Sequence, residues 1–143
     1  MFALHVRTRF CAAHALVFRG VLEPLHWHDW CVEAVVVGES LDEDGVLCDF
    51  HEVEADLAKI IAPFQNANLN TVPPFGSAGA KPDLNPSAEH VARHIGESLR
   101  LCLETRVGEC PKTTAGAGAA ARVVRVESVS VTEAEGCLAV YRL

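Results

Sequence analysis

The order of its extended and helical segments is the feature that most restricts the fold of this chain. Residues 2–12 alternate loosely in polarity, and residues 26–37, HWHDWCVEAVVV, form an extended run that ends in β-branched residues. Two similar runs, 122–132 and 137–142, lie near the other end. Two helical patterns separate these pairs, so the order β-β-α-α-β-β predicts an α+β fold. We expect a four-stranded antiparallel sheet with both helices on one face.

The two helices are predicted from their caps. Asp49 and Glu52 have the spacing of a capping box, and Pro63 is expected to end the first helix. Asn85 is expected to cap the second helix, with Pro86 in its first turn, where the missing N–H is not needed.

Three other segments carry local predictions. About twenty residues between the helices, QNANLNTVPPFGSAGAKPDL, have no periodicity, which is typical of a functional or mobile loop. The low-complexity run TTAGAGAAA at 113–121 is expected to form a flexible hairpin excursion. Apolar parity shifts between Val126 and Val129, which predicts a β-bulge.

Composition excludes several classes of protein. At 143 residues the chain is long enough for one domain, 1–143, and too short for two. The net charge is −7 with no cluster of Lys and Arg, so neither nucleic acid nor an anionic membrane is an expected partner. The N-terminal segment lacks the apolar core of a signal peptide, and the six cysteines form no C-x-x-C pair. We therefore expect a cytoplasmic protein with reduced thiols.

The motif LHWHDW predicts a metal site. His26 and His28 are two residues apart, so on a strand both imidazoles point to the same face. A catalytic zinc typically takes three protein ligands and leaves one position open, and His14 at the end of the neighbouring strand can supply the third. The alternatives are that the pair has no metal, or that His90 and His94, one helical turn apart, hold it instead.

Four strings in order, FCAAHAL, LHWHDWCVEAVVVGESLDEDGVLCDF, NPSAEHVARHI and VSVTEAEG, resemble the 6-pyruvoyl-tetrahydropterin synthase family. This family includes the bacterial 6-carboxy-tetrahydropterin synthases, and the resemblance covers nearly the whole chain. It implies the tunnelling fold, assembly as a trimer or hexamer, and zinc held by His14, His26 and His28. It also implies a pterin substrate, dihydroneopterin triphosphate, bound between subunits.

The same resemblance implies the residues that bind the pterin. Glu133 matches the glutamate that grips the pterin ring, while Ser87 and Glu89 match the loop that lines its pocket. A carboxylate can accept two hydrogen bonds from the adjacent ring N–H and exocyclic amine of a pterin. Without the resemblance, Glu133 would be a solvated turn residue, and the other two would simply suit a helix N-terminus.

The chain departs from the family at the positions that move protons. Leu22 stands in place of the usual cysteine, and Gln65 and Asn66 replace the usual Asp-His pair. Because none of these side chains titrates, the standard reaction should be badly impaired. Glu23, one residue from the cysteine position, is the best remaining catalytic candidate. Its alternative role is that of a loop carboxylate beside Pro24.

Cys11 and Cys31 are not expected to replace the missing base, because their strand parity turns both thiols away from the metal unless a bulge intervenes. Three hypotheses follow. The chain is a zinc-dependent lyase-type enzyme acting on a pterin side chain with an altered product, a pterin-binding protein without turnover, or a three-histidine zinc hydrolase unrelated to pterins.

Overall fold

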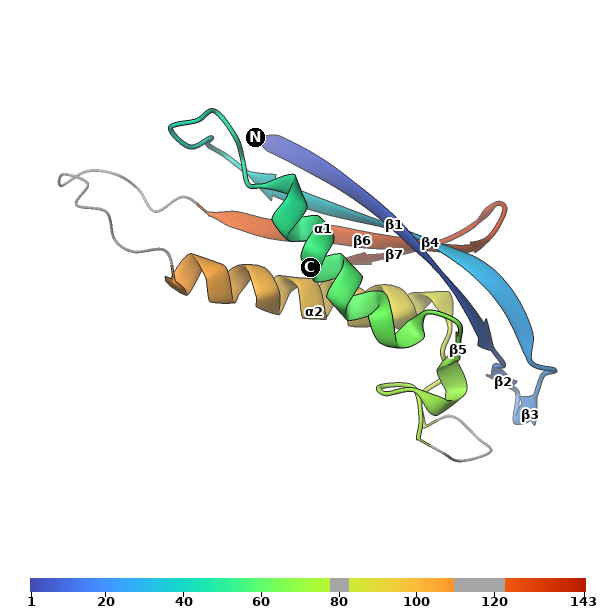
Figure 1. The fold of residues 1–143 in the computed structure, drawn as a ribbon. Coiled ribbons are helices and arrows are strands. Elements are labelled where there is room, and N and C mark those ends of the chain that lie inside the picture. Colours follow the sequence, from blue (N-terminus) through green and yellow to red (C-terminus); the bar gives the residue numbers. More distant parts are fainter. Residues whose placement is uncertain (78–82, 110–122) are drawn as a thin grey trace.

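The structure is a computed structural model that describes residues 1–77, 83–109 and 123–143. A five-stranded sheet in the order β5-β1-β4-β6-β7 forms one layer, and two helices form the other (Figure 1). A separate pair of short strands, β2 and β3, extends from the end of the first hairpin. The strands are β1 (Phe2–His14), β2 (Val17–Phe18), β3 (Val21–Leu22), β4 (His26–Gly38), β5 (Ala67–Asn68), β6 (Val124–Ala134) and β7 (Cys137–Arg142).

The central hairpin pairs β1 with β4 over their full length. The antiparallel register runs from Phe2 opposite Gly38 to His14 opposite His26, without interruption. Because side chains alternate across a strand, one face of this hairpin is apolar and faces the helices. The fully buried Trp30 lies on that face. The hairpin expected from the sequence is confirmed, and it places His14 opposite His26, two of the predicted metal ligands.

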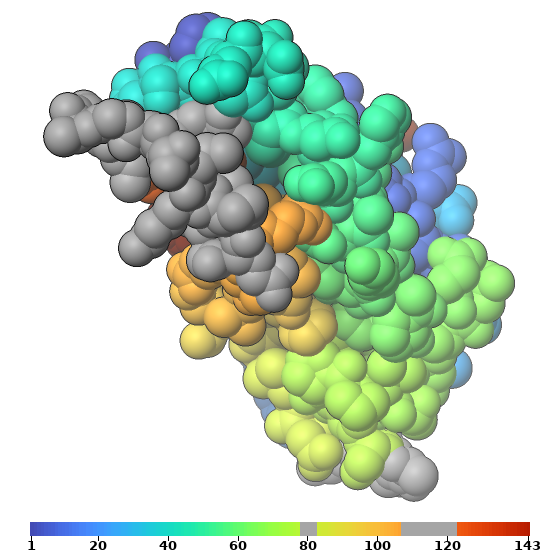
Figure 2. Space-filling model, turned by 60° about the vertical axis from the view of Figure 1, so that its left-hand side comes forward, coloured from blue at the N-terminus to red at the C-terminus, as the bar shows by residue number. Residues whose placement is uncertain are grey.

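Both helices, α1 (Phe50–Ile61) and α2 (Ala88–Glu109), cover the same face of the sheet. The Asp49 side chain accepts a hydrogen bond from the backbone N–H of His51 at 2.8 Å, which confirms the predicted cap of α1. A 3₁₀ turn, Ala62–Phe64, follows that helix. Figure 2 shows α1 in green beside α2 in yellow to orange, and Arg106 joins the two by an ion pair with the buried Asp56.

The sheet has one strand more than expected. β5 pairs in parallel with β1 at Ala12 and Ala13, so the sheet is mixed and not purely antiparallel. The predicted count was wrong because a two-residue strand is too short to leave a periodic pattern in the sequence. The segment that holds β5 also contains a second 3₁₀ turn, Leu69–Thr71, so the predicted loop has some local order.

The cap of α2 also differs from the prediction. The Asn85 side chain accepts a hydrogen bond from the Val17 N–H at 2.8 Å and donates one to the Val17 carbonyl at 2.9 Å. Its amide is therefore used in a tertiary contact. Ser87 caps the helix instead, because its hydroxyl oxygen accepts the backbone N–H of His90 at 3.4 Å.

The predicted bulge is present in β6. Val35 pairs with Ser128 whereas Val36 pairs with Val126, so Glu127 is the extra residue. The run at 113–121 lies outside the described residues. Within the described part of the chain, no helix has the length and apolar character needed to cross a membrane.

Candidate functional site

Three histidines converge at one end of the central hairpin. His14 pairs with His26 at the end of the ladder, and Ala12 pairs with His28 two residues further in. All three imidazoles lie on the face that carries the helices, as the alternation of the strands requires. One ring nitrogen from each lies within 4.8 Å of the others. This confirms that the three predicted ligands come together.

Backbone carbonyls fix two of the rings. Nδ1 of His14 donates to the carbonyl of Pro86 at 2.7 Å, and Nδ1 of His26 donates to the carbonyl of Pro24 at 2.9 Å. Metal-binding histidines commonly hold their second nitrogen in this way, because the contact fixes the tautomer. The Nε2 lone pairs of His14 and His26 are therefore left for a ligand.

The remaining nitrogens have the character of metal ligands. Nε2 of His14 and Nε2 of His28 are buried and have no hydrogen-bond partner among the described residues. Burial lowers the pKa of His14 below its usual 6.5, which favours the neutral imidazole that binds metals. Unsatisfied buried nitrogens are costly in a folded protein. The donor set therefore fits a zinc ion or a similar divalent metal.

Trp30 forms the floor of the histidine cluster. Its ring centroid lies 4.9 Å from that of His14 and 5.9 Å from that of His28, in edge-on contacts. Phe10 stacks on its other side at 5.7 Å, and its Nε1–H donates to the Ala12 carbonyl at 3.2 Å. The indole thus packs against the rings of His14 and His28 and limits their movement.

Two asparagines hold the chain that follows His14. The Asn70 amide accepts the Ala15 N–H at 2.8 Å and donates to the Ala15 carbonyl at 2.6 Å. Asn85 makes the same pair of contacts with Val17. The position of His14 therefore depends on residues more than 50 positions away in the sequence.

Two carboxylates lie beside the cluster. Oε2 of Glu133 is 3.8 Å from Nε2 of His14, and Oε1 of Glu23 is 3.9 Å from Nε2 of His26. The Glu23 oxygen also accepts the Leu16 N–H at 2.9 Å, whereas the Glu133 oxygen is buried without a hydrogen-bond partner in the described chain. Neither carboxylate belongs to the group of atoms within 4.8 Å.

A cavity of about 380 Å³ adjoins the cluster. It contains all three residues predicted to bind the pterin, Ser87, Glu89 and Glu133, with Leu16, Ala88, Gly136, Cys137, Leu138 and Ala139 completing the lining. The backbone N–H of Glu89 and the Ser87 hydroxyl hold the pKa of the Glu89 carboxyl below its usual value. The cavity therefore presents at least one carboxylate that stays ionised near neutral pH.

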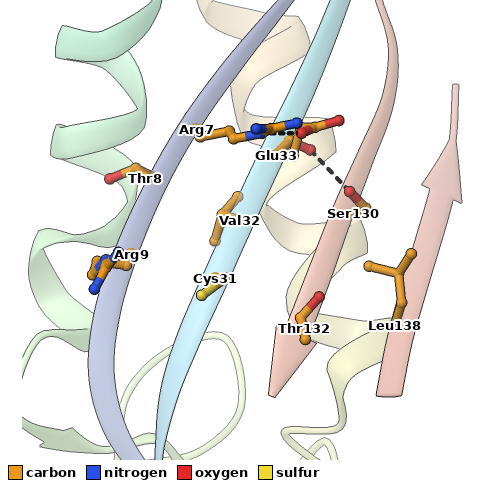
Figure 3. A pocket seen from close by; sticks show the side chains of 9 residues that line it. All are labelled: Arg7, Thr8, Arg9, Cys31, Val32, Glu33, Ser130, Thr132 and Leu138. Atoms are coloured by element: carbon orange, nitrogen blue, oxygen red, sulfur yellow. Dashed lines mark hydrogen bonds and ion pairs between the residues drawn. The ribbon is translucent and has the colours of Figure 1, made fainter. Parts of the chain in front are cut away.

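The other residues singled out from the sequence lie elsewhere. Gln65 and Asn66 contact the backbone of Cys11, through a Cys11 N–H to Gln65 Oε1 bond at 3.3 Å and an Asn66 N–H to Cys11 carbonyl bond at 2.6 Å. Cys31 faces away from the histidines, as predicted, and lines a separate pocket of about 560 Å³ on the opposite side of the sheet (Figure 3).

His90 and His94, the competing histidine pair, belong to no group of three or more potential metal ligands among the described residues. Nδ1 of His90 donates to the Asn85 carbonyl at 2.8 Å. The His94 ring packs against Phe64 and Phe75, with centroids 5.6 and 6.1 Å away. Each imidazole therefore has a structural contact of its own.

The approach of Glu133 to His14 is the feature that sequence reasoning missed. Thr132 pairs with Cys31, so the next residue on β6 lies beside Trp30 and on the face of the histidines. This placement depends on the register between β4 and β6, which the sequence does not state. The predicted bulge indicated that the register of β6 shifts, but it did not indicate which residue of β6 pairs with which residue of β4.

A mixed sheet backed by two helices, with three histidines at the end of its central hairpin, defines an α+β protein with a candidate metal centre. The family model described as 6-pyruvoyl tetrahydropterin synthase matches residues 3–143. The chain belongs to this family, whose members are lyases, and membership indicates a pterin-related function.

Solved structures share the fold at low sequence identity. The Caenorhabditis elegans 6-pyruvoyl tetrahydropterin synthase is 15% identical with a TM-score of 0.72, covering 99% of this chain and 95% of that one. The Plasmodium vivax enzyme is 16% identical with a TM-score of 0.67, covering 100% and 99%. A variant of the latter enzyme is described as a catalytic-residue mutant with glutamate changed to alanine. It is 16% identical with a TM-score of 0.70, covering 99% of this chain and 97% of that one. A comparison with curated proteins finds no match.

Proposed function

We propose that this chain binds zinc through His14, His26 and His28, binds a pterin in the adjoining cavity, and performs weak or altered lyase-type chemistry on the pterin side chain. One observation carries the proposal. Glu133 lines the cavity and also lies 3.8 Å from a buried, unpartnered nitrogen of the histidine cluster. A ligand in the cavity is therefore within reach of the metal site.

Each part of the site has a distinct task. Bound zinc would polarise a hydroxyl or carbonyl of the side chain and acidify the proton to be moved. The histidines hold their nitrogens toward one point because the carbonyls of Pro86 and Pro24 fix two of the rings. Trp30 packs against the His14 ring and limits its movement.

The cavity suits a small heterocycle. Its volume of about 380 Å³ lies in the range of small-molecule sites, and it contains both Glu89 and Glu133. A carboxylate that accepts two hydrogen bonds from adjacent ring donors selects a pterin over a ring with acceptors at those positions. The Ser87 hydroxyl can satisfy one further polar group of the ring. Dihydroneopterin triphosphate is the substrate that the family suggests.

Glu23 is the proposed proton acceptor. Its carboxylate is held by the Leu16 N–H and lies 3.9 Å from the metal-facing nitrogen of His26. This arrangement puts a base beside the point where a metal-bound substrate group would lie. A catalytic glutamate is known in the Plasmodium vivax relative, which supports a carboxylate in this role.

The second candidate is a pterin-binding protein without turnover. The observation that favours it is that Gln65 and Asn66, at positions where the family moves protons, contact the backbone of Cys11. Leu22, at the third such position, has no titratable group.

Incubation of the zinc-loaded protein with dihydroneopterin triphosphate, followed by chromatography and mass spectrometry, tests the proposal. We expect 6-pyruvoyl- or 6-carboxy-tetrahydropterin at a rate at least about 10²-fold below ordinary family turnover, because general acid–base transfer supplies that order of acceleration. Any product with a shortened side chain should disappear in Glu23→Gln and persist in Glu43→Gln, a change in a distant exposed loop. Turnover at the rate usual for the family would contradict the altered chemistry. If calorimetry detects no binding of a pterin, the proposed function as a whole is contradicted.

A further inference from the structure

We propose that Glu133 is a displaceable fourth ligand of the metal in the pterin-free protein, and that a pterin entering the cavity withdraws it. The ligand role rests only on the metal-binding part of the proposed function, whereas the displacement rests on its pterin-binding part as well. Two buried atoms without hydrogen bonds carry the argument, Oε2 of Glu133 and Nε2 of His14.

These two atoms do not satisfy each other while the His14 ring is neutral. Nδ1 of His14 carries the proton that it donates to the Pro86 carbonyl, so Nε2 of the neutral ring presents a lone pair. The Glu133 oxygen presents lone pairs as well, only 3.8 Å away. Two buried acceptors that face each other are unfavourable, and a cation between them removes the conflict.

The spacing fits a metal better than it fits a hydrogen bond. Zinc binds imidazole nitrogen and carboxylate oxygen at about 2.0–2.2 Å, so two tetrahedral ligands lie roughly 3.3–3.5 Å apart. The observed 3.8 Å is a few tenths longer. The carboxylate lies outside the group of nitrogens within 4.8 Å, so binding requires a rotation of the Glu133 side chain toward His26 and His28.

The second carboxylate is less suited to the same role. Oε1 of Glu23, its oxygen nearest to the cluster, already accepts the Leu16 N–H. The Glu133 oxygen has no such partner in the described part of the chain. The two carboxylates therefore have different roles, with Glu133 as a metal ligand and Glu23 as the proton acceptor.

Displacement follows from the position of Glu133 between the two compartments. Its side chain is 27% exposed and lines the cavity, so its carboxylate can turn toward ring donors there. A pterin that takes this carboxylate frees the fourth metal position, which its own side-chain hydroxyls need. The site would then stay closed until its ligand arrives.

Cobalt substitution tests the ligand role without measuring activity. The visible absorption of Co²⁺ changes with its ligands and coordination number, and zinc affinity can be measured by competition with a chelator. We expect Glu133→Gln to alter the pterin-free spectrum and to lower zinc affinity roughly 10–100-fold. Glu135→Gln is the matched control, because Glu135 is an exposed carboxylate two residues from Glu133 and lies outside the lining of the cavity. Its pterin-free spectrum and zinc affinity should match those of the unaltered protein.

Adding neopterin to the cobalt protein tests the displacement. The spectrum of the unaltered protein should shift on binding, and the Glu133→Gln spectrum should respond much less. If Glu133→Gln leaves both the pterin-free spectrum and the zinc affinity unchanged, the ligand role is overturned. If calorimetry shows binding while the cobalt spectrum stays constant, displacement is overturned and the proposed function stands. If no pterin binds but the variant spectrum differs, the ligand role is supported and the proposed function fails.

Discussion

Single imidazoles decide whether the hairpin end holds a metal. The three predicted ligands share one face, and two of them use their second nitrogen for backbone contacts. We expect about one zinc per chain in metal analysis of the purified protein. His28→Ala should release it, because two imidazoles and water bind zinc far more weakly than three imidazoles do.

His90→Ala is the control for that measurement. This histidine belongs to the competing helical pair but contacts the Asn85 carbonyl instead. The variant should retain its zinc. Zinc that survives in His28→Ala and is lost in His90→Ala would place the metal on α2 and refute the assignment.

His94 gives a prediction about acid stability. Burial against Phe64 and Phe75 lowers its pKa below the 6.5 of an unfolded histidine. Between these two pKa values the unfolded chain binds the extra proton, so the contribution of His94 to stability is complete above about pH 6.5 and falls as the pH drops. Urea unfolding at pH 7.5 and 5.0, with chelator present, should therefore show a smaller loss for His94→Leu than for the unaltered protein. Equal losses would contradict a buried neutral ring.

At the scale of elements, the site depends on side chains that act as backbone partners. Asn70 satisfies both the N–H and the carbonyl of Ala15, next to His14. Asn70→Leu leaves both groups buried and unpaired, which should cost about 1–3 kcal/mol of unfolding free energy for each group. Zinc affinity should fall as well, because the end of β1 loses its support. Chemical denaturation and chelator competition measure the two effects.

Asn68→Ala offers a comparison in the same segment, since the Asn68 side chain caps the short 3₁₀ turn and does not contact β1 through its amide. It should lose only about 1 kcal/mol, in the range of a helix cap. If Asn70→Leu is no more destabilising than Asn68→Ala, the contact with Ala15 is not what holds the site.

The elements that were predictable are those with a local signal. The alternation of apolar and polar residues predicted the central hairpin, and Asp49 marked the start of α1. The shift of apolar parity near Val126 located the bulge. Asn85 was misassigned as a cap because a side-chain amide fits a helix end and a tertiary contact equally well. The approach of Glu133 to the histidines was out of reach, since it depends on how β6 aligns with β4.

The whole molecule leaves two sheet edges for assembly. β7 has no partner on its outer side in the described chain, and β5 covers β1 only at Ala12 and Ala13. Exposed edges invite pairing with further strands, and closure into a ring removes them. We expect a homo-oligomer, a trimer or a pair of trimers. Analytical ultracentrifugation at micromolar concentration should show no substantial monomer, and a monomeric profile would contradict this expectation.

Trp30 gives this protein a built-in optical reporter. The chain has two tryptophans, and their environments are opposite: Trp30 is fully buried beside the histidines, whereas Trp27 is 57% exposed on the other face. Their fluorescence should therefore separate into a short-wavelength and a long-wavelength component. In Trp27→Phe only the buried indole emits, and Co²⁺, which quenches nearby fluorophores, should darken it on binding while Zn²⁺ should not. Occupancy of the centre could then be followed in real time without any added dye, and emission insensitive to Co²⁺ would place the metal away from the Trp30 floor.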